Sequence, residues 1–276
     1  LVNAVANAWL DRVPMLAISG QIEGRREATF THQVLDHNRM FSPVSKWAVS
    51  IRPDTVATVM RKALRVAMAE RPGPVHLTTA ADVVGAVASD DRILMPPLQV
   101  QQSLQVFGAA GADPVKQLKA AKRPIVLAGI SAMRAGAGPA LARFAETVGC
   151  PVVVAPMAKG VLAEDHAYYA STLDMACNQY VWDFLKGADL LLCAGFDAVE
   201  LIKPWSLAVP AIHIDSTPNT DQIVPAEIEL VGDIGQILAW LAEGCGSLAR
   251  WSEAEVDAHR AGLRKAYLEG RVAGKL

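Results

Sequence analysis

Two histidines and a carboxylate lie close together in a polar stretch near the start of the sequence. His32, Asp36 and His37 are separated by only a few residues, and Gln33 places a neutral amide among them. Imidazole and carboxylate groups at this spacing can exchange protons with a substrate or bind a metal ion. The spacing fits no familiar metal motif, so the sequence predicts no metal site, and an ordinary solvated loop has the same composition.

Three further candidates stand where short apolar runs end. Gly129 begins a glycine-containing turn, but the G-x-G-x-x-G spacing of a dinucleotide site is absent, which favours a plain strand-to-helix turn. Lys159 either binds an anion or lies in solvent. Asp215 ends an apolar run and either binds a ribose hydroxyl or caps the next turn. These residues alone indicate an α/β protein with a candidate nucleotide crevice.

Helical segments alternate with short apolar runs along the chain, and this alternation sets the expected fold. Proline starts, acidic caps and glycine stops mark the helices, whereas the apolar runs have the length of strands. Continuous apolar strands between helices predict an α/β fold with a doubly wound, mostly parallel sheet covered on both faces. Strands are expected at 13–19, 45–51, 75–79, 124–129, 151–155, 190–195, 211–215 and 228–231, and helices at 53–68, 139–148, 178–186 and 233–243, with a short one from Pro114.

Breaks in this alternation divide the chain. Residues 1–84 are expected to form a smaller, incomplete α/β unit in which 22–43 is irregular, and residues 85–111 are expected to be a linker. Residues 112–247 are expected to form a larger, Rossmann-like unit. Residues 248–276 contain a charged helical pattern and are expected to begin the connection to a domain that is absent from this chain.

Composition argues against several kinds of protein. Of 276 residues, 52% are hydrophobic and 20% are charged, and the net charge is −2 with both signs interspersed. This pattern predicts no nucleic-acid or membrane partner, and no apolar run approaches the length of a bilayer span. Four cysteines without a Cys-x-x-Cys pair favour a cytoplasmic location over a zinc or disulfide framework. The sequence starts at Leu1 without a methionine, so it is expected to begin inside a longer protein.

Several motifs, read together and in order, resemble the thiamine-diphosphate enzymes of the acetolactate synthase and pyruvate oxidase group. The resemblance covers nearly the whole chain. It implies that 1–84 is the carboxyl-terminal part of that family's pyrimidine-binding domain and that 112–247 is its central domain. The segments that carry it are NAVANA (3–8), VPMLAISGQ (13–21), RPGPVHL (71–77), Lys159-Gly160, ADLL (188–191), IHID (212–215) and ELVGDI (229–234).

Within this group the chain is most similar to the flavin-free, catabolic acetolactate synthases. The stretch 32–46, with His-Gln followed by Met-Phe-Ser-Pro-Val and a lysine, resembles theirs, as does Gly195-Phe196-Asp197 with its following Val-Glu pair. Flavin-containing relatives carry an arginine where this chain has Gly195. The chain departs from the family pattern at Ala80-Ala81, where a proline is usual, and at Pro156-Met157.

The resemblance assigns roles to several side chains. It implies that Gln33, accompanied by His32 and His37, lies on the substrate side of the cofactor, and that Gly20 and Gln21 belong to the wall of the pyrimidine domain. A neutral amide at such a site can bind a substrate carboxylate or a developing oxyanion without adding charge. Lys159 and Asp215 are the candidates for a nucleotide crevice in the central domain.

The family's cofactor-binding motifs are expected outside this chain. The activating glutamate precedes the matched region, and the Gly-Asp-Gly motif that holds Mg²⁺ and diphosphate follows it. The resemblance therefore implies thiamine diphosphate and Mg²⁺ in the full-length enzyme, no FAD, and neither cofactor binding nor turnover by these 276 residues alone.

The resulting hypothesis is a carboligase or decarboxylase of small 2-oxo acids, most like a flavin-free acetolactate synthase, assembled as a homodimer or homotetramer. One alternative is another family member, either a 2-oxo acid decarboxylase or an acyltransferase. A second alternative is a non-catalytic nucleotide-binding or scaffold module.

Overall fold

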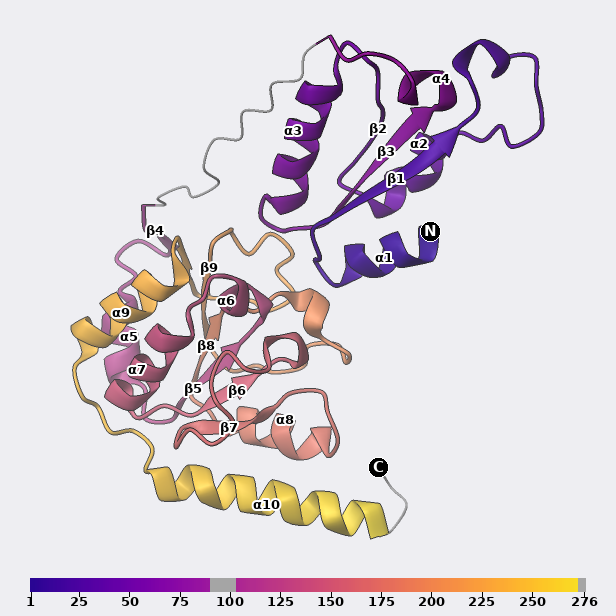
Figure 1. The fold of residues 1–276 in the computed structure, drawn as a ribbon. Coiled ribbons are helices and arrows are strands. Elements are labelled where there is room, and N and C mark those ends of the chain that lie inside the picture. Colours follow the sequence, from indigo (N-terminus) through magenta and orange to yellow (C-terminus); the bar gives the residue numbers. More distant parts are fainter. Residues whose placement is uncertain (90–102, 273–276) are drawn as a thin grey trace. The chain divides into compact units, whose positions relative to one another are not determined.

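The chain folds into two compact units, residues 1–100 and 101–276. The computed structural model describes residues 1–89 and 103–272 (Figure 1). Both units alternate helices with strands, and their sheets are parallel except for one edge strand of the second unit. The expected α/β fold with mostly parallel sheets is confirmed.

The first unit is a three-stranded parallel sheet flanked by helices, with strand order β1-β3-β2. Its elements are α1 (Val2–Leu10), β1 (Met15–Gln21), α2 (His37–Phe41), β2 (Trp47–Ser50), α3 (Val56–Met68), β3 (Pro74–Ala80) and α4 (Ala81–Val84).

The central strand β3 divides its side chains between two faces because successive residues of a strand point in opposite directions. Val75 and Leu77 are fully buried and pack against Ala63 and neighbouring residues of α3. His76 and Thr78 therefore point to the opposite face. That face carries a second small core in which Ala17 packs with Phe41 of α2, so it is also the face to which α2 brings its polar residues.

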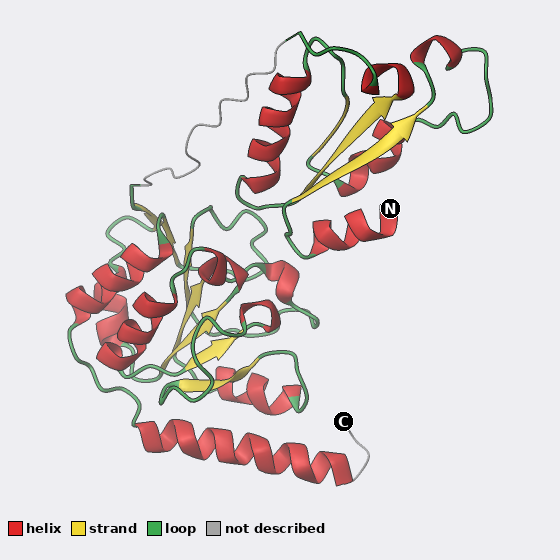
Figure 2. Cartoon of the chain, in the orientation of Figure 1, coloured by secondary structure: helices red, strands yellow, loops and turns green. Residues whose placement is uncertain are grey.

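The second unit is built on a seven-stranded sheet with the order β4-β10-β9-β8-β5-β6-β7, in which only β4 is antiparallel (Figure 2). Its strands are β4 (Gln105–Gly108), β5 (Pro124–Ala128), β6 (Val152–Val154), β7 (Tyr169–Thr172), β8 (Leu190–Ala194), β9 (Ala211–Asp215) and β10 (Ile228–Val231). Its helices are α5 (Pro114–Ala120), α6 (Ile130–Arg134), α7 (Gly138–Val148), α8 (Asn178–Lys186), α9 (Ile234–Cys245) and α10 (Glu253–Val272).

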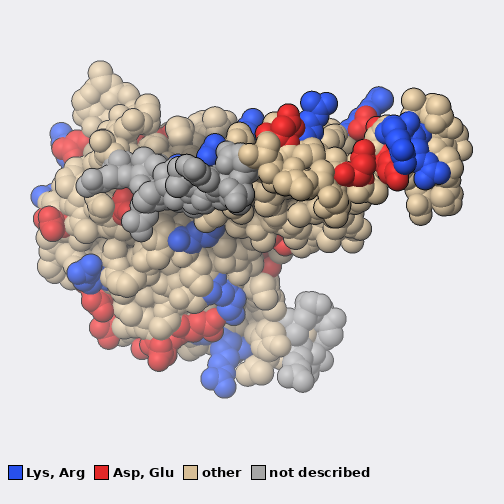
Figure 3. Space-filling model, turned by 45° about the horizontal axis from the view of Figure 1, so that its top comes forward, with Lys and Arg blue, Asp and Glu red and all other residues tan. Residues whose placement is uncertain are grey.

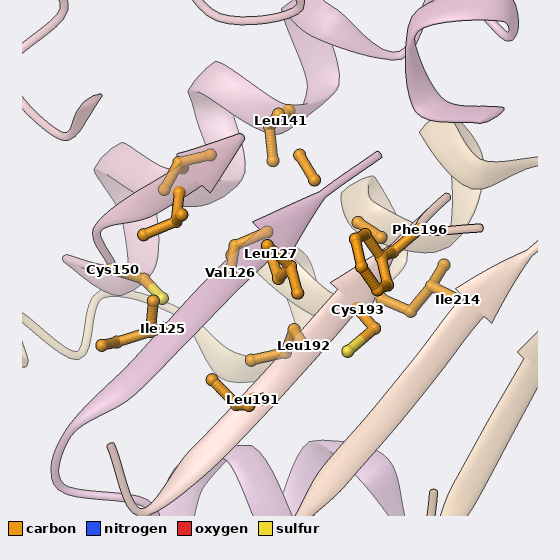
Figure 4. Close-up of a cluster of buried hydrophobic side chains, with 14 of the residues drawn as sticks. Ile125, Val126, Leu127, Leu141, Cys150, Leu191, Leu192, Cys193, Phe196 and Ile214 are labelled. Atoms are coloured by element: carbon orange, nitrogen blue, oxygen red, sulfur yellow. The ribbon is translucent and has the colours of Figure 1, made fainter. Parts of the chain in front are cut away.

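Helices cover both faces of this sheet, with α5, α7 and α9 packed together on one side and α8 on the other (Figure 1). All residues of β5, β8 and β9 are buried. Figure 4 shows side chains such as Leu127, Leu192 and Ile214 filling the space around the central strands. Burial of apolar surface at about 25 cal/mol per Å² makes this cluster the main source of stability for the unit.

Local signals fix the ends of the helices. Asp113 caps α5 and Asp233 caps α9, each by accepting a hydrogen bond from a backbone N–H of the first turn. Gly149 ends α7 in the left-handed conformation, with φ of 66°. These caps are why the expected helix positions in the second unit are matched to within a few residues.

Several segments differ from the sequence expectations, which included no helix at α1, α4 or α6. The stretch 22–43, expected to be irregular, contains the helix α2, which starts at an Asp36 cap. The expected linker 85–111 contains β4, which pairs antiparallel with β10; residues 90–102 of that linker lie outside the described residues. The strand β7 was not expected, because the run Tyr169–Thr172 is only partly apolar.

Helix α10 packs on its own unit, beside β7 and α8. The buried Trp251 anchors its start, since its indole Nε1 donates to the carbonyl of Pro124 at 2.9 Å. The guanidinium group of Arg123 lies 3.3 Å from the centroid of the same ring. The described part of the segment that the sequence assigns to an outgoing connection, residues 248–272, is therefore joined to the central sheet through Trp251.

Candidate functional site

A row of three hydroxyl groups crosses the carboxyl end of the first sheet. Ser19 of β1 and Ser50 of β2 are both in register with Thr78 of β3. Partners in register point to the same face of a parallel sheet. The strand order β1-β3-β2 therefore places the three hydroxyl groups side by side, on the face that α2 covers.

Helix α2 adds an amide to this row. Asp36 caps the helix by accepting a hydrogen bond from the backbone N–H of Arg39 at 2.9 Å. The cap fixes the start of α2, and Asn38 in its first turn contacts the sheet. The Asn38 side chain accepts from Thr78 Oγ1 at 3.2 Å and donates to Ser50 Oγ at 2.9 Å. These two hydrogen bonds tie α2 to the central and outer strands.

His37 and His76 meet at the third hydroxyl group. Ser19 Oγ lies 2.9 Å from His37 Nδ1 and 2.9 Å from His76 Nε2. The His76 ring is fully buried and stacks on Phe41 with a centroid distance of 3.9 Å and an interplanar angle of 8°. Burial, reinforced by the charge of His37, lowers the pKa of His76 to about 4, so this ring is neutral at physiological pH.

A cleft of about 760 Å³ opens beside this network. Such a volume is within the usual range for small-molecule sites. His37 and Asn38 line it, so one of the two imidazoles faces the cleft and the other lies behind it. The remaining lining residues are Gln21, Gly24, Glu27, Val34, Leu35, Asp36, Ser50, Ile51, Arg52, Pro53, Asp54, Thr78, Ala80, Asp82 and Val83.

The charged side chains on the cleft wall are mostly acidic. Glu27, Asp36, Asp54 and Asp82 line it, opposed by the single arginine Arg52. Elsewhere the two signs are mixed, as the blue and red atoms of the face in Figure 3 show. The cleft therefore favours a ligand that carries a positive charge or none at its outer end.

The loop residues singled out from the sequence occupy different places. Gln33 and His32 are exposed, and neither lines the cleft; Gln33 has a left-handed backbone with φ of 62°. Gln21 does line it, donating from Nε2 to the carbonyl of Leu35 at 2.7 Å, while Gly20 is exposed at the end of β1. The structure thus brings His37 and Gln21 to the cleft but not His32, Gln33 or Gly20.

In the second unit, protein groups lie against the strand ends where nucleotides bind such sheets. From β5 the chain proceeds to β6 and β7 on one side and then to β8, β9 and β10 on the other, so the switch point lies between β5 and β8. Gly129 and Gly195 end these two strands. A Cβ atom at Gly195, whose φ is 60°, would overlap the backbone nitrogen of Ala132. Strand ends and α6 therefore touch directly here.

Glu200 fills the remaining space at the switch point. Its carboxylate accepts from the backbone N–H groups of Ile130 at 2.8 Å and Asp197 at 3.4 Å. Amides at the start of a helix are the groups that a phosphate uses in a nucleotide site. Burial raises the pKa of Glu200 to about 7, although those two hydrogen bonds and the nearby Arg134 oppose the shift.

Lys159 and Asp215 do not form one crevice. They follow β6 and β9, which are three strand spacings apart in the sheet, or roughly 14 Å. Lys159 is half-exposed and pairs with Glu164 at 2.9 Å. The buried Asp215 accepts hydrogen bonds from the N–H and hydroxyl groups of Ser216, and burial raises its pKa. Its observed contacts are those of a turn cap.

Two searches of the described residues gave negative results. Within 1–89 and 103–272, no three His, Cys, Asp or Glu side chains converge in a way that could hold a metal ion. In the same ranges, no helix has the length and apolar character of a membrane span.

Ser19, His76, Asn38 and Glu200 were not identified as site residues from the sequence. One signal was present: in 74–80 the polar residues His76 and Thr78 alternate with apolar ones, which is typical of a strand with one polar face. The partners of these residues depend on strand order, which no local pattern reveals.

Comparison with known proteins supplies the family context. The sequence model for the central domain of thiamine pyrophosphate enzymes matches residues 112–241. The catabolic acetolactate synthase of Raoultella terrigena is 32% identical over 253 residues, which are 88% of this chain and 44% of that protein. A Pseudomonas aeruginosa protein named "Probable 2-ketoarginine decarboxylase" is 26% identical across 99% of this chain and 48% of its own length.

A solved structure shares the fold. The benzoylformate decarboxylase of Polynucleobacter necessarius superimposes with a TM-score of 0.71 at 21% identity, over 89% of this chain and 47% of that one. The chain thus spans less than half the length of the relatives it matches.

Proposed function

Because the chain belongs to the thiamine-diphosphate-dependent, acetolactate synthase-like enzymes, we propose that it forms part of an enzyme that joins or decarboxylates 2-oxo acids. The leading candidate is a flavin-free acetolactate synthase, which decarboxylates pyruvate and transfers the two-carbon unit. The observation that carries this proposal is the 32% identity to a catabolic acetolactate synthase across 88% of the chain.

The cofactor's diphosphate half does not fit the described residues. Binding of Mg²⁺ and diphosphate requires several oxygen ligands on one site, and the described ranges hold no such cluster. Thiamine diphosphate, when bound, would supply a nucleophilic ylid and a thiazolium ring that accepts the electron pair left by decarboxylation. The first unit would contribute a polar wall, in which Gln21, His37 and Asn38 orient a substrate by hydrogen bonds. We assign Gln33 and His32 to the substrate side by resemblance alone, since both are exposed and neither lines the cleft.

A second candidate is a decarboxylase whose 2-oxo acid ends in a cationic group. Four carboxylate residues and one arginine line the cleft, and acidic walls attract a guanidinium or ammonium group. A relative that matches 99% of the chain is named for 2-ketoarginine.

We further propose that the central unit binds no flavin and serves as a spacer between cofactor-binding domains. The support is the contact of Gly195 with α6 and the carboxylate of Glu200 on the Ile130 amide. A dinucleotide phosphate would have to displace that carboxylate, which already satisfies the amide. A scaffold that binds a nucleotide is the non-catalytic alternative.

Assembly and location are also proposals. The resemblance is the basis for proposing a homodimer or homotetramer of the full-length enzyme. A cytoplasmic location agrees with the four cysteines, which are all free thiols. Light scattering of the purified full-length protein measures the assembly.

The decisive experiment is product analysis of the full-length gene product with thiamine diphosphate and Mg²⁺. Acetolactate from pyruvate supports the leading candidate, and carbon dioxide release from 2-ketoarginine without acetolactate supports the second. Failure to bind thiamine diphosphate in calorimetric titration would leave only the scaffold. The same titration of these 276 residues alone is expected to be silent.

A further inference from the structure

We propose that Ser19 and His76 are positioning residues that orient His37, so that its Nδ1 accepts a hydrogen bond from Ser19 and its Nε2–H is offered to the cleft as a hydrogen-bond donor. The proposal starts from the central place of the Ser19 hydroxyl group, 2.9 Å from a nitrogen of each ring.

The hydroxyl group allows three arrangements of protons, because Ser19 has one hydrogen to donate and two lone pairs that accept. His76 donates to Ser19 and Ser19 donates to His37, or the direction is reversed, or both rings donate to Ser19. The last arrangement leaves the Ser19 hydrogen without an acceptor among the described residues, since the side-chain hydrogen bonds of Ser19 are to these two rings. In each of the other two, the direction of the hydrogen bonds sets the tautomers of both rings.

The burial of His76 decides the direction. The ring is neutral because burial lowers its pKa to about 4, so it carries one proton. Its Nδ1 is buried and has no hydrogen-bond partner among the described residues. Buried donors without a partner are rarer in proteins than buried acceptors without one. The proton of His76 therefore lies on Nε2, where it is donated to Ser19.

Packing and the hydrogen bond to Ser19 together fix the His76 ring. The ring lies flat on Phe41 within the core beneath α2, and a half-turn that preserved this stack would turn Nε2 away from Ser19. Ser19 then donates to Nδ1 of His37, whose own proton must be on Nε2. Since His37 lines the cleft, Nε2–H is the donor available to a ligand oxygen.

The ligand class follows from the donor. An imidazole N–H that lines the cleft suits the carbonyl or carboxylate oxygen of a 2-oxo acid, because such an oxygen accepts the hydrogen bond that the N–H donates. This last step rests on the proposed function, whereas the direction of the hydrogen bonds does not.

The tautomer can be read directly by NMR. The chain contains six histidines, so ring-¹⁵N labelling of histidine and long-range ¹H–¹⁵N correlation give six resolvable patterns, with His37→Asn and His76→Phe assigning two of them. The expected result for both rings is an unprotonated Nδ1 and a protonated Nε2. A proton on Nδ1 of His37 in the unaltered chain would overturn the proposal.

Variants test the positioning itself. Ser19→Ala should convert His37 to a mixture of both tautomers, while Ser19→Thr, which keeps the hydroxyl group, should preserve the single one. Ser50→Ala removes a hydroxyl group of the same row that does not contact His37, and it should leave the pattern unchanged. A single unaltered tautomer in Ser19→Ala would contradict the proposal even if His76→Phe fails to fold.

Kinetics of the full-length enzyme separate this inference from the proposed function. Ser19→Ala is expected to lower kcat/KM about 10-fold, with recovery in Ser19→Thr. A mixed tautomer with unchanged kcat/KM would uphold the hydrogen-bond direction and contradict the role of the cleft in catalysis.

Discussion

The carboxylate of Glu200 accepts a hydrogen bond from the backbone N–H of Ile130 at 2.8 Å, at the switch point of the seven-stranded sheet. A buried acid thus holds the amide that a bound phosphate would otherwise use. Because the site is sealed, the acid also has a raised pKa, of about 7, and its protonation should influence folding.

The free energy of unfolding of the Glu200→Gln variant should increase relative to that of the unaltered chain as pH rises. The folded-state pKa of Glu200 lies above its ordinary value of 4.5. Between pH 4.5 and pH 7 Glu200 is therefore protonated in the folded chain but ionised in the unfolded chain. The stability that this difference contributes is lost as pH rises through 7. Between pH 5 and pH 8 the difference in unfolding free energy should shift by roughly 1–3 kcal/mol in favour of the variant. Urea unfolding measures it; exposed Glu243→Gln should show no such shift.

Gly195→Ala should destabilise the second unit strongly. The new Cβ would overlap the Ala132 backbone, and φ of 60° is unfavourable for any side chain. We expect a loss of about 3–5 kcal/mol in unfolding free energy. Gly20→Ala is the matched control, since a Cβ there meets nothing within 4 Å. Equal stability of the two variants would refute the close contact with α6.

Lowering the pH should reduce the free energy of unfolding, because two buried histidines are neutral in the folded chain. Burial lowers the pKa of His259 and of His76 to about 4. Below about pH 6.5 the unfolded chain therefore binds more protons than the folded chain does. The free energy of unfolding is then expected to fall as pH decreases from 6.5 toward 4, by up to about 1.4 kcal/mol per pH unit for each ring. His259→Phe keeps the stack on Phe184 and should reduce the slope, whereas exposed His32→Gln should not.

In the full-length enzyme, removing the Gln33 amide should lower kcat/KM by about 10-fold to 1000-fold. Because Gln33 has φ of 62°, glycine is a better truncation than alanine, and Gln33→Asn tests whether an amide in the same conformation rescues activity. Steady-state kinetics with pyruvate measures both. Unchanged kinetics in Gln33→Gly beside a crippled His37→Ala would transfer the role to His37.

The purified full-length protein should be colourless. If the central unit binds no flavin, as proposed above from the contacts of Glu200 and Gly195, absorption spectra should lack a flavin band and added FAD should show no saturable quenching. A yellow preparation would contradict the sealed switch point.

Buried elements were predicted from the sequence more accurately than exposed ones. Strands β5, β8 and β9 are buried along their whole length, so their apolar runs stand out and their positions were predicted well. The four residues of β4 are exposed, and no pattern distinguishes such an edge strand from a linker. His37 was found as a candidate because it lies in a polar cluster, but its link to His76 through Ser19 depends on pairing between β1 and β3. Long-range register of this kind leaves no local trace.

The fit of Gly195 against Ala132 also bears on how this crevice could change during evolution. An arginine at 195 would collide with α6, and moving α6 first would break the hydrogen bond from Ser131 to the Gly195 carbonyl at 2.9 Å. Loss of Glu200 alone would leave the Ile130 amide unpaired. Each of these single substitutions is therefore expected to destabilise the unit by itself, so a nucleotide crevice could open here only through several simultaneous changes.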